Sequence, residues 1–153
     1  MKRRMKSLAA SFKAAGNGIA RTVKHERNMR IHIVMAVYVI LFGFLGKVSS
    51  VQWAIFFLCF AAVISAELVN TALERVCDTV DSGFNISIGI IKDLAAGAVL
   101  VSALCSAAAG LCIFLSPQVL GNILNVLTAN LWVFALIALS LIPALVFIFK
   151  KSK

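Results

Sequence analysis

The chain has 153 residues, 61% of them hydrophobic, and a mean hydropathy of +0.99. Soluble domains are about 45–50% apolar, so this composition excludes an ordinary soluble protein and predicts a single integral membrane domain. Fifteen basic residues face six acidic ones, and the net charge is +9. We attribute this excess to membrane topology and to contact with anionic lipids, and we expect no nucleic-acid partner.

The first 28 residues predict an amphipathic helix on the membrane surface. Basic residues are frequent here, and no apolar core begins before Ile31, so a cleaved signal peptide is not expected. Apolar residues recur at steps of three and four, as on one helical face: Leu8, Phe12, Ala15, Ile19 and Val23. A basic helix with such a stripe lies flat at the interface. A flexible basic tail is the alternative for the first few residues.

Four apolar segments follow, and each predicts a transmembrane helix: 29–46, 51–80, 92–115 and 123–149. A span needs about 20 residues, so the first segment is short and the second is long enough to project into water. Ser116 and Pro117 should end the third helix. The expected fold is therefore all-α, with a surface helix and four transmembrane helices in one domain.

The distribution of basic residues predicts that both termini lie in the cytosol. Nine basic residues lie in the N-terminal segment up to Arg30, two lie around the central loop and three lie at the C-terminus, whereas the turns on the opposite side contain only Lys47. Positively charged loops remain cytosolic, so four spans satisfy this distribution. All six acidic residues then lie on the cytosolic side as well.

The end of the second span carries an unusual group of polar residues. Residues 66–78 read A-E-L-V-N-T-A-L-E-R-V-C-D, in which Glu67, Asn70, Glu74 and Asp78 are spaced by three, four and four. This spacing places them on one face of a helix. Ionisable groups at the end of a membrane helix are costly and indicate a functional site. The alternative is a solvated helix end whose acids face water.

This acidic face favours an enzyme that handles a nucleotide. Carboxylate oxygens suit Mg²⁺ bound to nucleotide phosphates, and the nearby Lys92 suits a phosphate. The chain has neither a Walker A loop nor the glycine-rich loop of protein kinases. An ion or proton transporter would distribute its acids through the depth of the membrane. A small structural or regulatory protein would leave the acidic face unexplained.

The cysteines and histidines indicate no metal site of their own. No cysteine has the C-x-x-C spacing of a zinc site or a disulfide framework, so all four are interpreted as apolar filler: Cys59, Cys77, Cys105 and Cys112. His25 and His32 lie at the entrance to the first span. We interpret both as polar filler or surface donors.

Three motifs resemble those of the prokaryotic diacylglycerol kinase family, which includes the undecaprenol kinases of Gram-positive bacteria. They are residues 66–78, the stretch K-D-L-A-A-G-A-V-L at 92–100, and E-R-N-M-R-I-H at 26–32. The similarity extends from about residue 12 to residue 115. The third motif is more similar to the undecaprenol kinase branch than to the proteobacterial diacylglycerol kinases.

The resemblance implies an enzyme that transfers the γ-phosphate of MgATP to the hydroxyl of a membrane lipid. Undecaprenol is the expected substrate, and diacylglycerol is the alternative. The family also implies a homotrimer in the bacterial plasma membrane, with active sites between protomers at the cytosolic surface. Family members usually end after three spans, so the fourth predicted here is expected at the periphery of the trimer.

The resemblance also implies a role for each polar residue of these motifs. Glu67 would be the general base and bind the lipid hydroxyl, and Asn70 would orient the end of the lipid. The other side chains would bind MgATP, with Mg²⁺ held by Glu26 and Glu74 and the nucleotide contacted by Glu26, Glu74, Asp78, Lys92 and Asp93.

Overall fold

The computed structural model describes residues 8–80 and 85–150, and within them it contains helices and no strands. This confirms the predicted all-α class. Four of the helices are long and apolar enough to cross a membrane, namely α2, α3, α4 and α6. The elements in chain order are α1 (Leu8–His25), α2 (Arg27–Leu45), α3 (Ser50–Val80), α4 (Ile86–Phe114), α5 (Pro117–Ala129) and α6 (Leu131–Phe149).

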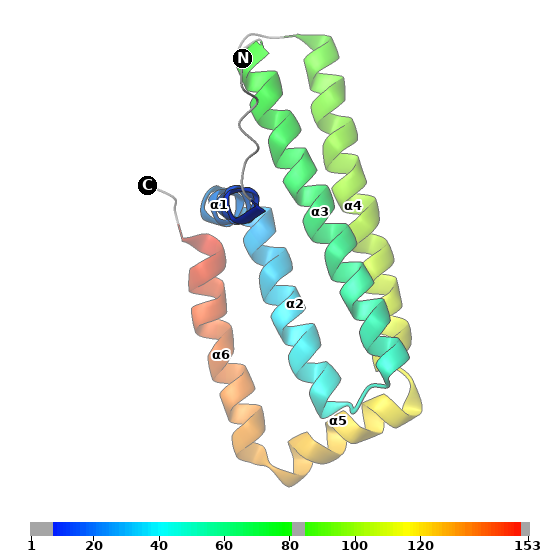
Figure 1. Ribbon diagram of the computed structural model, residues 1–153. Helices are drawn as coiled ribbons and strands as arrows, with labels where there is room; N and C mark the ends of the chain where they lie inside the picture. The colour runs from blue at the N-terminus through cyan, green and yellow to red at the C-terminus, as the bar shows by residue number, and fades with distance from the viewer. Residues whose placement is uncertain (1–7, 81–84, 151–153) are drawn as a thin grey trace.

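Helix α1 lies across the direction of the long helices and is seen nearly end-on in Figure 1. Thr22 is its only buried residue among those described. Helix α1 ends at His25 and α2 begins at Arg27, so Glu26 alone forms the corner, in an extended conformation (φ −97°, ψ 120°). The corner places Glu26 at the entrance to the first span, where its sequence position predicted it.

Helices α3 and α4 pack side by side along their length and extend beyond the level of α1 (Figure 1). Helix α3 has 31 residues and is about 46 Å long, more than the roughly 30 Å of a bilayer core. Helix α4 begins at Ile86, earlier than the predicted start at residue 92. The reason is Asn85, whose side chain accepts hydrogen bonds from the backbone N–H groups of Ser87 and Ile88 and caps the helix.

The prediction of one helix over residues 123–149 was wrong in its bounds. The structure has two helices there, because Asn130 leaves the helical conformation (φ −133°, ψ 78°). The first, α5, begins at Pro117, next to the expected end of the third helix and six residues before the predicted start, and crosses the end of the bundle opposite α1 (Figure 1). The fourth membrane-spanning helix is therefore the 19-residue α6, which lies beside α2.

An apolar core at this opposite end anchors α5. Phe56 of α3 stacks on Phe114 of α4 with ring centroids 5.3 Å apart, and Val119 and Ile123 of α5 belong to the same buried cluster. The side chain of Asn122 donates a hydrogen bond to the backbone oxygen of Gly46 at 2.9 Å. Helix α5 is thus fixed against the turn between α2 and α3.

The docking of α5 requires a residue without a side chain at position 46, which is Gly46. A Cβ atom at this position would lie 2.6 Å from a methyl group of Val119 and 3.1 Å from the carbonyl oxygen of Phe42. We therefore expect Gly46→Ala to destabilise the protein by about 1–3 kcal/mol, the usual cost of overpacking. Thermal unfolding in detergent, followed by circular dichroism, measures the change.

The matched control is Gly121→Ala on α5, where an added Cβ meets no atom within 4 Å. This substitution should leave the melting temperature unchanged or raise it, because alanine favours a helix over glycine by up to about 1 kcal/mol. Equal melting temperatures for the two variants would show that α5 does not dock as described.

Candidate functional site

The predicted acidic face of α3 borders a cavity of about 280 Å³ between α2, α3 and α4. Glu67, Asn70 and Glu74 line it together, as their spacing predicted. The other walls come from α2 and α4, and the lining residues on those helices are Asn28, Ile31, His32, Ala96, Val99, Leu100 and Ala103. Asp78, the fourth residue of the face, does not line the cavity.

Glu67 is the most deeply buried charged residue of the described chain, with 1% of its surface exposed. Its Oε2 atom has no hydrogen-bond partner. A buried polar atom without a partner costs about 1–3 kcal/mol, so native structures rarely leave one. An unpartnered acceptor on the wall of a cavity indicates a place where a bound molecule donates a hydrogen bond.

Asn70 is hydrogen-bonded to one of the two carboxylates of the cavity, that of Glu74. Its side-chain Nδ2 donates a hydrogen bond to Glu74 Oε1 at 3.0 Å, and its Oδ1 atom is buried without a partner. The amide therefore holds Glu74 in one orientation and leaves a second acceptor for a ligand.

Glu26 approaches this group from the corner before α2. It is half-buried and makes no capping hydrogen bond with its side chain. The charges of Glu26 and Glu74 both act on the carboxyl of Glu67, so carboxylates from two parts of the chain are brought near one another. No group of three or more His, Cys, Asp or Glu side chains lies close enough to hold a metal ion within residues 8–80 and 85–150.

Asp78 and Lys92 form an ion pair between α3 and α4, with 2.6 Å between Asp78 Oδ1 and Lys92 Nζ. Both side chains are exposed to solvent to a large extent. Exposed pairs contribute little to stability, so a phosphate could take the place of Asp78 at small cost. Asp93 is exposed and does not line the cavity. The sequence predicted that Lys92 and Asp93 open this helix, but α4 begins at Ile86, so both residues lie inside it.

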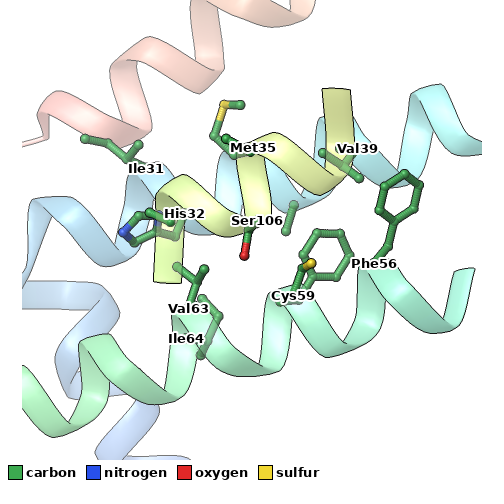
Figure 2. Close-up of a pocket in the computed structure, with 14 residues that line it drawn as sticks. Ile31, His32, Met35, Val39, Phe56, Cys59, Val63, Ile64 and Ser106 are labelled. Atoms are coloured by element: carbon green, nitrogen blue, oxygen red, sulfur yellow. The ribbon is translucent and has the colours of Figure 1, made fainter. Parts of the chain in front are cut away.

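A second cavity, of about 290 Å³, is lined almost entirely by apolar side chains of α2, α3 and α4. Figure 2 shows His32, Cys59 and Phe56 around this space. His32 and Ala103 line both cavities, so the polar and apolar cavities adjoin. The interpretation of His32 as polar filler overlooked this position. His32 lies four residues after Asn28, so both side chains are on the same face of the helix. This spacing could have indicated that His32 lines the cavity.

The sequence model of the family described as "Prokaryotic diacylglycerol kinase" matches residues 13–114. This chain belongs to the prokaryotic diacylglycerol kinase family. The match ends at the last residue of α4, so α5 and α6 lie beyond it. No solved structure matches the chain significantly.

Two curated proteins match the kinase over much of its length. It is 42% identical to the undecaprenol kinase of Bacillus subtilis over 105 residues, which are 69% of this chain and 85% of that protein. It is 38% identical to the diacylglycerol kinase of Synechocystis sp. over 112 residues, which are 72% of this chain and 64% of that protein. The chain is thus a multi-pass membrane lipid kinase, an ATP-dependent phosphotransferase, as its motifs predicted.

The unpartnered oxygen of Glu67 leads to a prediction for the kinase without ligands. Glu67→Gln keeps the shape of the side chain and removes its charge, so it should lower the cost of burial. We expect the melting temperature to rise by roughly 3 °C, equivalent to about 1 kcal/mol for a chain of this size.

Asp93→Asn is the control, because it removes an exposed carboxylate and should leave the melting temperature unchanged. A lower melting temperature for Glu67→Gln would mean that the carboxylate has a stabilising partner in the free protein.

Proposed function

We propose that this kinase transfers the γ-phosphate of MgATP to undecaprenol and so produces undecaprenyl phosphate. One observation carries the proposal: buried Glu67, which has an unpartnered oxygen, lines a polar cavity that adjoins an apolar one. The name of the Bacillus subtilis relative and the motif at residues 26–32 favour undecaprenol. Diacylglycerol is the second candidate, because the Synechocystis relative has that name.

In this proposal the apolar cavity holds the lipid chain near its hydroxyl. The hydroxyl passes His32 into the polar cavity and donates a hydrogen bond to Glu67 Oε2. Glu67 then acts as the general base, which requires a separation of about 2.6–3.2 Å from the hydroxyl oxygen. Asn70, which lines the same cavity one turn along α3, orients the end of the lipid.

Glu26 and Glu74 hold the divalent metal in this proposal, and Mg²⁺ fits them. Magnesium in nucleotide enzymes is usually bound by one or two carboxylates, with phosphates and water completing the shell. The charges of Glu26 and Glu74 both act on the carboxyl of Glu67, which supports two carboxylates at one site. When bound, the ion neutralises charge on the transferred phosphoryl group. The fixed orientation of Glu74, held by Asn70, prepares the site for it.

The nucleotide then extends toward the ends of α3 and α4 that project beyond α1. Lys92 exchanges Asp78 for a phosphate of ATP, and Asp78 and Asp93 support the nucleotide on its polar side. Phosphoryl transfer depends on positioning and charge neutralisation more than on covalent chemistry of the protein, so these few residues suffice.

We further propose a homotrimer with active sites between protomers. A groove of about 500 Å³ runs between α3 and α4 on a second side of Asn70, and its walls include the small residues Ala66, Ala95 and Ala98. Small side chains let membrane helices approach one another closely. A helix of a neighbouring protomer in this groove would border the site at Asn70.

The site lies on the cytosolic face of the bacterial plasma membrane in this proposal. Helix α1 and the end of α6 lie toward the same end of the bundle in Figure 1, and the basic residues of the sequence gather on that side. Lys47 is the only basic residue in the turns on the other side. The whole chain forms one membrane domain, and no nucleic acid is required.

The direct test is a phosphorylation assay in lipid nanodiscs. Purified protein and MgATP are given undecaprenol or diacylglycerol at equal mole fractions, with Glu67→Gln protein as the inactive control. We expect undecaprenol to be phosphorylated with the higher kcat/KM. The reverse order would assign the enzyme to diacylglycerol, and phosphorylation of neither lipid would contradict the proposal.

The metal role predicts a specific defect for Glu74→Gln. This change keeps the size of the side chain and removes a charge that Mg²⁺ needs, so turnover should fall by about 100-fold or more. Raising the Mg²⁺ concentration should restore part of the activity of Glu74→Asp and little of that of Glu74→Gln. Asn70 keeps a partner in both variants. Near-normal turnover of Glu74→Gln in a folded, assembled protein would exclude Glu74 as a metal ligand.

A further inference from the structure

Arg30, in the first turn of α2, joins the ends of two other helices. It is 7% exposed. Its Nη1 atom donates hydrogen bonds to the backbone oxygens of Val23 at 3.2 Å and Lys24 at 3.0 Å, in the last turn of α1. Its Nε atom donates to the backbone oxygen of Ile148 at 3.2 Å, in the last turn of α6.

These carbonyl groups need a partner from outside their own helices. The last four carbonyl oxygens of an α-helix have no intrahelical donor, and the helix dipole places partial negative charge there. One guanidinium group therefore satisfies carbonyls at two helix ends and carries the favourable charge for both. A lysine could not do this, because the flat fork of arginine directs its donors to several acceptors at once.

Two further contacts join α6 to α2 along the same pair of helices. Tyr38 and Ser140 share a hydrogen bond of 2.8 Å near the middle of the pair, and Arg27 lies over the ring of Phe149 with 6.0 Å to its centroid. Helix α6 has no buried residue. Because lipid tails are as apolar as α6 itself, such contacts add to the one from Arg30 in holding the helix against α2.

We propose that Arg30 is a positioning residue for Glu26, and that α6 acts on the active site through it. Glu26 is the single residue between α1 and α2, and Arg30 bonds across this corner to the last turn of α1. The angle of the corner, and with it the direction of the Glu26 carboxylate, depends on that brace. The brace in turn depends on Ile148, which lies outside the part of the chain that matches the family.

This inference rests on the proposed role of Glu26 in holding the metal. Loosening the brace then weakens binding of MgATP and leaves the proposed lipid-contacting residues of α3, Glu67 and Asn70, in place. Outer residues that orient a metal ligand typically contribute about 10–100-fold in metal affinity. We expect a defect of that size in the KM for MgATP, with kcat at saturation and the KM for lipid unchanged.

Two variants of the full chain test the brace from its two sides. Arg30→Lys keeps the charge and loses the fork. Phe147→Pro keeps Arg30 and disrupts the last turn of α6, because proline in a helix removes a hydrogen bond and clashes with the carbonyl four residues earlier. Combining the two should give no more than the larger single effect, since both break the same connection.

Two controls separate this effect from a general loosening of α6. Phe147→Ala removes the same side chain and keeps the helix, and Tyr38→Phe breaks the other hydrogen bond between α2 and α6. Both should leave the KM for MgATP unchanged. If Tyr38→Phe raises it as much as Arg30→Lys does, or if all variants raise the KM for lipid equally, the positioning role is wrong.

Hydrogen–deuterium exchange supplies a readout that is independent of activity. Arg30→Lys and Phe147→Pro should both accelerate exchange of the backbone amides from residue 22 to residue 30, while the controls do not. Unchanged exchange there would overturn the brace itself. An unchanged KM for MgATP in Glu26→Gln, with accelerated exchange in the brace variants, would instead refute the metal role of Glu26 and with it the effect of α6 on the site.

Discussion

The structure depends on keeping one carboxyl group, that of Glu67, in the interior of a bundle of apolar helices. Water at the membrane surface would solvate this group freely, and burial removes that solvation without supplying a partner for Oε2. A protein retains such a cost where function requires it. The packing of α2, α3 and α4 around this position makes both the polar cavity and the apolar cavity beside it.

The length of α3 explains how one helix reaches both the apolar interior of the bilayer and the water at its surface. Its first half stacks aromatic rings in the apolar core, and its second half carries the polar face. Because α3 is longer than the bilayer core, its last turns pass through the interface, where a lipid hydroxyl and a water-soluble nucleotide can both reach it. A shorter helix would have placed the same residues either in lipid or wholly in water.

The sequence predicted what depends on local spacing and missed what depends on distant contacts. Steps of three and four placed Glu67, Asn70 and Glu74 on one face, and the same steps carried Asp78 past the end of the cavity to its ion pair with Lys92. The break at Asn130 was missed because the length and overall hydropathy of residues 123–149 suit a single span, although Asn125, Thr128 and Asn130 interrupt the stretch. The position of His32 between two cavities, and the bond from Arg30 to a carbonyl 118 residues away, follow only from tertiary packing.

Helix α5 has a consequence for how such a chain could have grown. At 1.5 Å per residue its 13 residues carry the backbone about 20 Å sideways, so the final span settles against α2, although it follows α4 in the sequence. Figure 1 shows α6 on the other side of α2 from α3 and α4. A hydrophobic hairpin of this shape can be added to the end of a smaller ancestor without covering the groove between α3 and α4. The helices up to α4 would keep their existing contacts, and α6 would pack beside α2, the first span.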